Sequence, residues 1–174
     1  ETGGSLNSNR ITYVAYMFRY MNPQYYFINV SLYQGGNSSG WYAAFGVYSA
    51  FQNGTARSTA TQSVKNQVDT WKNTVNSLSS EAEKVKMIHD LIVQKVDYNT
   101  DIYGNSFNED TAYTQSVYSV FCMDKTVCAG YAQAFEMMCN GVGVDCIAVT
   151  SDDHEWNKVR INDSWYNVDC TWAD

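Results

Sequence analysis

The sequence predicts an α+β fold, in which helices fill most of the chain before a small antiparallel sheet at its end. The 174 residues are 45% hydrophobic and 17% charged, as in a folded domain with its own core. Apolar residues recur with a helical period in several segments up to residue 141, and they alternate as in strands from residue 144 onward. These patterns place the sheet after the helices along the chain.

Charge and hydropathy exclude two classes of protein. The net charge is −7, and the 11 lysines and arginines form no cluster, so we expect no nucleic-acid partner. No apolar run approaches about 18 residues, so we expect no membrane span. Abundant tyrosine, asparagine and serine with few lysines are typical of an exported protein, and we therefore expect an extracellular or cell-surface location.

The beginning of the chain predicts a helix followed by a hairpin. Residues 10–22 carry apolar side chains at helical spacing, and Pro23 ends the helix. Residues 25–34 are typical of a strand, and residues 41–51 form its expected hairpin partner, although their alanines and glycine weaken that prediction. Together these elements predict a helix-and-hairpin subregion over residues 6–55.

Three further helices are expected between the hairpin and residue 121. A helix over residues 56–78 is followed by one that opens at Ser80, with Glu83 three residues later as in a capping box. One face of this second helix is apolar and is expected to pack on the core, through Val85, Ile88, Ile92 and Val96. A short helix is expected over residues 113–121.

The end of the chain predicts three successive strands, over residues 144–151, 154–161 and 164–172. Asn162 and Asp163 tolerate the positive φ that a tight hairpin turn requires. If these two residues form the loop, His154 and Asp169 become diagonal neighbours on the same face of the sheet. A four-residue loop preserves this arrangement, whereas a three-residue loop moves Asp169 to the opposite face.

The cysteines do not predict a metal site. The chain has five, and an odd number leaves at least one thiol outside any intramolecular pair. It contains no Cys-x-x-Cys motif and only two histidines, so we expect no bound zinc. We expect mostly free, buried thiols at Cys122, Cys128, Cys139, Cys146 and Cys170.

Cys128 stands where a further helix is expected to begin, and this helix is expected to stop at Asn140-Gly141. The positive end of a helix dipole favours a thiolate. An imidazolium nearby would favour it further, so we expect a cysteine pKa well below the ordinary value of about 8.5. With His154 and Asp169, Cys128 supplies the parts of a thiol-imidazole-carboxylate triad.

Each of these residues also has an ordinary structural explanation. A cysteine in an apolar helix is usually part of the core. A histidine at a strand edge is often a surface residue. Asp169 is more informative, because strands disfavour aspartate and its neighbours Trp165 and Trp172 suggest burial, where a carboxylate needs a partner. The three residues taken singly leave these alternatives open.

Two stretches resemble the transglutaminase-like superfamily of bacterial proteins. They are "TVCAGYAQAFEMMCNGVGVDC" and "DHEWNKVRINDSWYNVDCTWAD". The family pattern is Cys followed by small-Gly-Tyr-Ala, then His-x-Trp-Asn-x-Val, then Trp-Tyr-x-Val-Asp-x-Thr-Trp. All three blocks occur in order, with spacings of 26 (154 − 128) and 15 (169 − 154) residues. The match covers roughly residues 80–174, and "MNPQYYFINV" is a looser echo of a segment found upstream in Gram-positive members.

The resemblance implies a fold and a site. The fold is papain-like, with the nucleophile helix packed on an antiparallel sheet and a transglutaminase-like catalytic core over residues 56–174. Cys128 is the implied nucleophile, His154 the general base and then acid, and Asp169 the residue that orients the imidazole. Tyr98 is the candidate second oxyanion donor. The candidate walls that keep water from the acyl group are Trp156 and Trp172.

The chain departs from the family pattern in two places. Glu155 stands where many relatives have alanine, which changes the rim of the expected site. The chain also stops at Asp174, where relatives usually add further strands, so we expect the C-terminal part of the core to be truncated.

The implied reaction is a transglutaminase-type acyl transfer. A thioester forms from a glutamine carboxamide and is resolved by a lysine amine or by water. A cysteine protease or amidase on the same fold is the alternative, and a non-catalytic surface binding module is a more distant one. The implied partners are protein or peptide substrates with glutamine and lysine side chains. We expect no cofactor and a Gram-positive source, and the sequence leaves the oligomeric state open.

Overall fold

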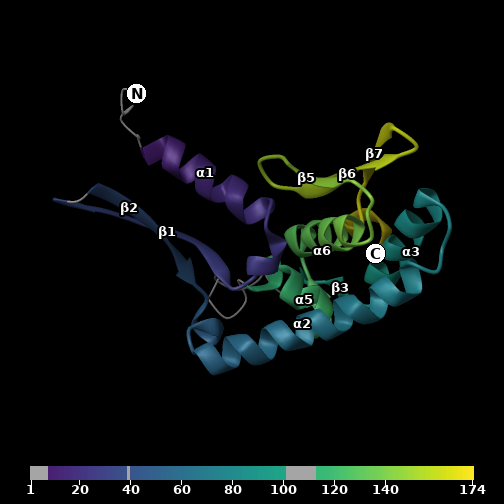
Figure 1. The fold of residues 1–174 in the computed structure, drawn as a ribbon, viewed down its shortest axis with the longest axis horizontal. Helices are drawn as coiled ribbons and strands as arrows, with labels where there is room; N and C mark the ends of the chain where they lie inside the picture. Colours follow the sequence, from purple (N-terminus) through teal and green to yellow (C-terminus); the bar gives the residue numbers. More distant parts are fainter. Residues whose placement is uncertain (1–7, 39, 101–112) are drawn as a thin grey trace.

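The computed structural model describes residues 8–38, 40–100 and 113–174. The expected N-terminal helix and hairpin are present as α1 (Ser8–Tyr20), β1 (Ile28–Asn37) and β2 (Gly40–Val47). The two strands pair antiparallel, and they extend away from the other helices (Figure 1). A 3-10 turn over Pro23–Tyr25 follows α1, so β1 begins later than expected.

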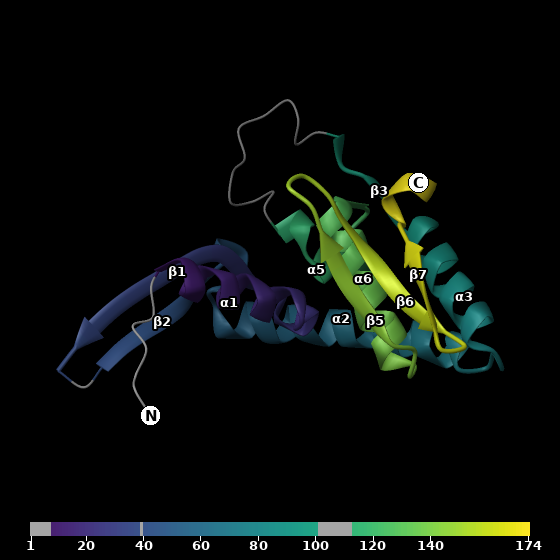
Figure 2. The ribbon, with the colours of Figure 1, turned by 90° about the horizontal axis from the view of Figure 1, so that it is seen from above.

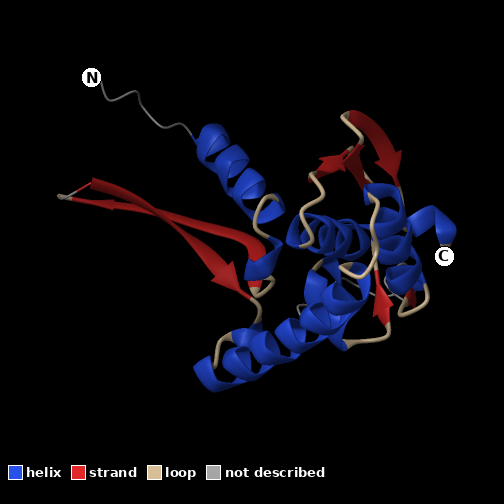
Figure 3. Ribbon diagram, turned by 45° about the vertical axis from the view of Figure 1, so that its right-hand side comes forward, coloured by secondary structure: helices blue, strands red, loops and turns tan. Residues whose placement is uncertain are grey.

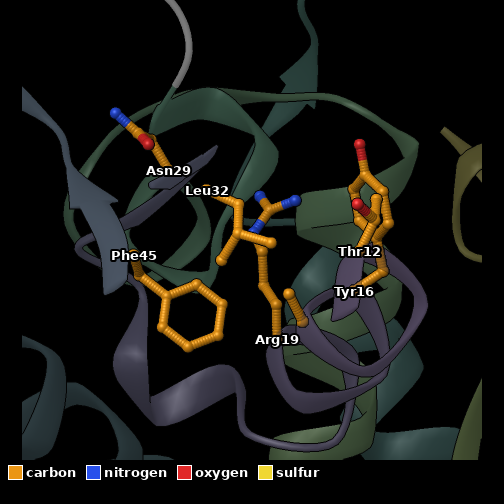
Figure 4. Close-up of a pocket in the computed structure, with 7 residues that line it drawn as sticks. Thr12, Tyr16, Arg19, Asn29, Leu32 and Phe45 are labelled. Carbon is orange, nitrogen blue, oxygen red and sulfur yellow. The ribbon is translucent and has the colours of Figure 1, made fainter. Parts of the chain in front are cut away.

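The side chain of Arg19 links this N-terminal part to the rest of the chain. It extends between α1 and the hairpin, beside Phe45, where a cavity of about 20 Å³ remains (Figure 4). Arg19 is buried, and its guanidinium donates to the carbonyl of Gln115 at 3.0 Å. Tyr26 makes a second link, because its ring stacks on that of Tyr118 with centroids 5.6 Å apart.

The helices that follow are α2 (Gly54–Val75), α3 (Glu81–Val93), α5 (Val117–Cys122) and α6 (Cys128–Gly141). The predicted capping box is present: Ser80 Oγ accepts from the Glu83 N–H, and the Glu83 carboxylate accepts from the Ser80 N–H, each at 3.2 Å. The short helix expected over 113–121 is divided into a 3-10 turn at Tyr113–Gln115 and α5. Helix α6 begins at the expected residue.

The C-terminal sheet consists of β5 (Cys146–Thr150), β6 (Glu155–Ile161) and β7 (Ser164–Val168), antiparallel and in that order. Ile161 pairs with Ser164, and the two residues between them have φ of 49° and 64°. The predicted two-residue turn at Asn162 and Asp163 is therefore confirmed. A parallel pair formed by β3 (Asp97–Tyr98) and β4 (Lys125–Thr126) had not been expected.

Helix α6 lies at the centre of the core. The sheet covers one side of it, while α5 and α2 lie on the other side (Figures 1 and 3). Figure 2 shows β5 and β6 running along α6, and α3 beside β7. Four side chains of α6 are completely buried in the core: Ala134, Phe135, Met138 and Cys139. The predicted packing of this helix on an antiparallel sheet is thus observed, and its first residue lies at one end of the layer interface.

The thiols are mostly buried as predicted, whereas the two tryptophans that suggested burial around Asp169 are themselves exposed. All five cysteines are free, and Cys139, Cys146 and Cys170 are buried as expected. By contrast, Trp165 is 49% exposed and Trp172 is 83% exposed. Both lie in or just after the edge strand β7, so their outward side chains remain in solvent.

Within the ranges described above, no helix combines the length and apolar character that crossing a membrane requires.

Candidate active site

Cys128 is the first residue of α6, and its sulfur is half-buried. The approach of the chain to this point is fixed by a buried network. Ser119 Oγ and Thr126 Oγ1 lie 2.6 Å apart, and they lie 3.0 Å and 3.1 Å from the carbonyl oxygen of Thr114. Gly130 is required beside this network, because a Cβ there would lie 1.9 Å from Thr126 Oγ1. The glycine two residues after the cysteine therefore allows the helix start to pack closely on β4.

His154 and Asp169 lie just outside the paired part of the sheet. The β6–β7 ladder ends at the pair Asn157 and Val168, and beyond it the chain of β7 turns toward the 3-10 segment Thr171–Ala173. The imidazole Nε2 of His154 and Oδ2 of Asp169 are 2.7 Å apart. The register that the sequence predicts thus brings the two side chains together, although neither residue belongs to a strand.

Both partners of this pair are held by further bonds. The Thr171 N–H donates to the other oxygen of Asp169 at 3.0 Å. The backbone of His154 is fixed by Ser151, whose hydroxyl accepts from the His154 N–H at 3.2 Å and whose N–H donates to the His154 carbonyl at 2.8 Å. With Nε2 engaged by the carboxylate, Nδ1 of the imidazole is the nitrogen left to exchange a proton with a nucleophile.

The sulfur of Cys128 lies against the start of β6. The backbone N–H of Glu155, the residue after His154, donates a hydrogen bond to this sulfur, and so does the N–H of Ala129. The negative charge of Asp169 also acts on the thiol. The sequence-predicted thiol, imidazole and carboxylate therefore come from the first residue of α6, the residue before β6 and the residue after β7, and they meet at one end of the sheet.

The direction of the cysteine pKa corrects the expectation from sequence. Burial raises the pKa of Cys128 above its ordinary value, and the two backbone N–H bonds oppose this only in part. The negative charges of Glu155 and Asp169 raise the pKa further. The expectation of a depressed pKa was wrong because it counted the helix dipole without the desolvation and the neighbouring carboxylates.

Two of the three aromatic candidates lie against His154. The ring of Trp156 stacks on the imidazole with centroids 5.8 Å apart, and its indole N–H donates to Asn167 at 3.3 Å. Trp172 meets the imidazole edge-on at 6.3 Å. Tyr98 has its ring partly buried against the core, and its backbone N–H donates to Asp174 at 2.6 Å. The roles expected of these aromatic side chains remain predictions.

We did not expect several buried polar residues to lie together beside the site. Glu155 is 5% exposed and Glu136, on α6, is 6% exposed. Burial raises the pKa of Glu155 to about 8, which Arg19 and Gln133 oppose, and burial raises the pKa of Glu136 to about 7. Strand alternation could have indicated the inward position of Glu155, because it shares a face of β6 with buried Asn157.

Among the described residues no cluster of acidic, histidine and cysteine side chains could hold a metal ion.

Comparison with known proteins places this chain in a family. A family model for the transglutaminase-like superfamily matches residues 69–170, more than half of the chain, and the protein belongs to that superfamily. The crystal structure of a TGase aligns with a TM-score of 0.56 at 13% identity, covering 97% of this chain and 48% of the other. The fold of the transglutaminase-like superfamily, an α+β papain-like fold, is therefore confirmed.

Two curated relatives carry the name of a peptidase. The kyphoscoliosis peptidases of Mus musculus and Homo sapiens are each 29% identical to this chain over 110 residues. The matched part is 54% of this chain and 16% of each relative. The chain thus spans only a small share of the length of these proteins.

Proposed function

We propose that this protein is a transglutaminase-type acyltransferase that acts on glutamine side chains of proteins or peptides. The observation that carries the proposal is the 2.7 Å bond between His154 and Asp169 beside the sulfur of Cys128 at the start of α6. A thiol, an imidazole and a carboxylate in this order are what acyl transfer through a thioester requires.

In the first half of the reaction, His154 Nδ1 removes the proton of the Cys128 thiol as the sulfur attacks the glutamine carboxamide carbon. The resulting oxyanion can accept a hydrogen bond from the Cys128 backbone N–H, because that group lies at an open helix start. The imidazolium then returns the proton to the amide nitrogen, ammonia leaves and a thioester remains. Asp169 orients the ring and stabilises the imidazolium.

In the second half, a lysine amine attacks the thioester while His154 removes one of its protons. Collapse of the second tetrahedral intermediate releases an isopeptide bond and restores the Cys128 thiol. If water attacks instead, the product is glutamate. The aromatic rings of Trp156 and Trp172 lie beside the imidazole, where they would limit the access of water to the thioester.

A cysteine protease is the second candidate, and the names of the two peptidase relatives favour it. The same groups could cleave a backbone amide, since attack on a peptide carbonyl needs the same nucleophile, base and oxyanion donor. The two functions differ in which amide reaches the thiol, a glutamine side chain or a peptide bond.

The decisive experiment supplies a glutamine-rich protein and a labelled primary amine. We expect amine incorporation together with ammonia release, and we expect Cys128→Ala to abolish both. Cys122→Ala is the matched control, because Cys122 is also a half-buried free thiol but belongs to α5. New peptide termini without incorporation would establish the protease instead. A protein that does neither would overturn the enzymatic proposal and support a binding module.

A further inference from the structure

A groove with an unusual lining lies between α1 and the sheet edge. It has a volume of about 450 Å³ and is bounded by the end of α1, the C-terminal half of α6 and strand β5. The walls are apolar, with Met17 and Met21 on one side and Ile147 on the other. Glu136, which is only 6% exposed, also lines the groove. A single acidic group among apolar walls matches the aliphatic stem and charged end of a lysine side chain.

The carboxyl group of Glu136 is incompletely paired. Its Oε2 is buried and has no hydrogen-bond partner among the described residues, although the backbone N–H of Ala148 donates to the carboxyl group. Burying an ionised carboxylate without a partner is costly, so such groups usually meet a counter-charge or remain protonated. An unpartnered oxygen on a buried residue that lines a groove therefore indicates a missing cationic or hydrogen-bonding ligand.

The groove leads to the proposed active site. Strand β5 forms its long wall, and the last residue of that strand, Thr150, also lines the groove. Thr150 pairs with Glu155, whose backbone N–H bonds the sulfur of Cys128. At the opposite end, the side chain of Asn140 bonds both the N–H and the carbonyl of Cys146 at 3.0 Å, which closes that part of the strand edge. A peptide lying in the groove would thus run toward the thiol.

Helix geometry sets the spacing between Cys128 and Glu136. Glu136 follows Cys128 by eight residues of the same helix (136 − 128). At a rise of about 1.5 Å per residue the two lie roughly 12 Å apart along the axis. An extended peptide advances by about 3.3 Å per residue, so roughly three to four residues cover this distance.

We propose that this groove is a substrate subsite in which Glu136 binds the ammonium group of a lysine three or four residues away from the reacting glutamine. The proposal rests on the function proposed for Cys128, and it names the class of peptide that this site selects. Met17, Met21 and Ile147 pack on the methylene groups of the lysine. The net charge of −7 adds a general attraction for such basic peptides.

A binding measurement tests the subsite without requiring turnover. The whole chain carrying Cys128→Ala is titrated with fluorescent glutamine peptides in which one lysine is moved along an otherwise neutral sequence. We expect the tightest binding with the lysine three or four residues from the glutamine, and about tenfold weaker binding when norleucine replaces it, because a charged hydrogen bond is lost. Equal binding of all peptides would overturn the proposal.

Two substitutions locate the effect. Glu136→Gln should abolish the preference for lysine over norleucine, whereas Asp69→Asn, at an exposed ion pair on α2, should leave it unchanged. Melting temperatures of both variants report whether the fold is retained. If Glu136→Gln unfolds the protein, Ala148→Leu narrows the same groove and should weaken binding of every long side chain. A lysine preference that survives Glu136→Gln, or undiminished binding of long side chains to Ala148→Leu, would refute this location.

The pH dependence supplies an independent check. Burial raises the pKa of Glu136 to about 7, so its carboxylate fraction increases between pH 6 and pH 8. The titratable groups around it are Glu155 on β6, Cys139 on α6, and Tyr20 and Cys146 in the groove lining. The cation next to Glu155, Arg19, donates to the carbonyl of Gln115, so the preference for lysine should grow over this pH range. A preference that is constant with pH would exclude Glu136 as its source.

Discussion

The two faces of strand β6 differ in how completely their polar groups are paired. On the outer face, the imidazole of His154, just before the strand, bonds Asp169, and the indole of Trp156 bonds Asn167. On the inner face, Glu155 and Asn157 are more deeply buried, yet each has one side-chain oxygen without a partner in the described part of the chain. The more exposed face is thus the better satisfied one.

This difference separates two physical roles. The paired groups hold an imidazole in one orientation, which is what a proton-transfer site requires. The unpaired inner groups carry a desolvation cost and shift pKa values instead. Removing a partner on the outer face should therefore affect the reaction, whereas removing a charge on the inner face should affect the stability of the fold.

The largest effect is expected from Asp169→Asn. The amide keeps the shape of the carboxylate but cannot stabilise the imidazolium, and it favours the wrong imidazole tautomer. We expect amine incorporation to fall about 10³- to 10⁴-fold with little change in melting temperature. Asp163→Asn, in the exposed β6–β7 turn, is the matched control and should retain full activity. Comparable rates for the two variants would remove Asp169 from the proposed mechanism.

A smaller effect, on stability, is expected from Glu155→Gln. Burial raises the folded-state pKa of Glu155 from 4.5 to about 8, so the protonated form is favoured in the folded protein. The stability that this group contributes is complete below pH 4.5 and is lost as the pH rises through 8. The loss in the free energy of unfolding is at most a few kcal/mol. A glutamine cannot ionise, and it should remove much of that slope.

Urea unfolding of the wild type and Glu155→Gln at pH 5 and pH 8 measures this difference. The variant should be the more stable of the two at pH 8, and its advantage should shrink at pH 5. Glu136 shows the same direction of shift, so some pH dependence should remain in the variant. If the stability of the two proteins changes with pH in parallel, Glu155 on the inner face of β6 does not carry the predicted desolvation cost.

Much of the outer face could be predicted from sequence because it depends on local rules. The two-residue turn at Asn162 and Asp163 sets the register, and the register brings His154 toward Asp169. The start of α6 at Cys128 likewise follows from the sequence pattern. These features involve residues close together in the chain, or strands joined by one turn.

The environment of the inner face could not be predicted in the same way. Arg19 and Tyr20 reach this region only because α1 packs across the chain, and the anchoring bond from Arg19 to Gln115 spans 96 residues. The pKa of Cys128 depends on burial by such distant elements, which is why the helix-dipole argument gave the wrong sign. The groove beside Glu136 exists for the same reason, since α1 forms one of its walls.

The smallest effect is expected where the outer face is most exposed, at Trp172. This side chain is 83% exposed and meets the imidazole only with its edge, so Trp172→Ala should leave the melting temperature unchanged. Loss of one aromatic contact should admit more water to the thioester and raise glutamate over isopeptide product about threefold. Trp165→Ala is the matched control, because Trp165 is exposed on β7, at the far end of the ladder from His154. If the two variants give the same product ratio, Trp172 does not shield the thioester, and the outer face acts through His154 and Asp169 without it.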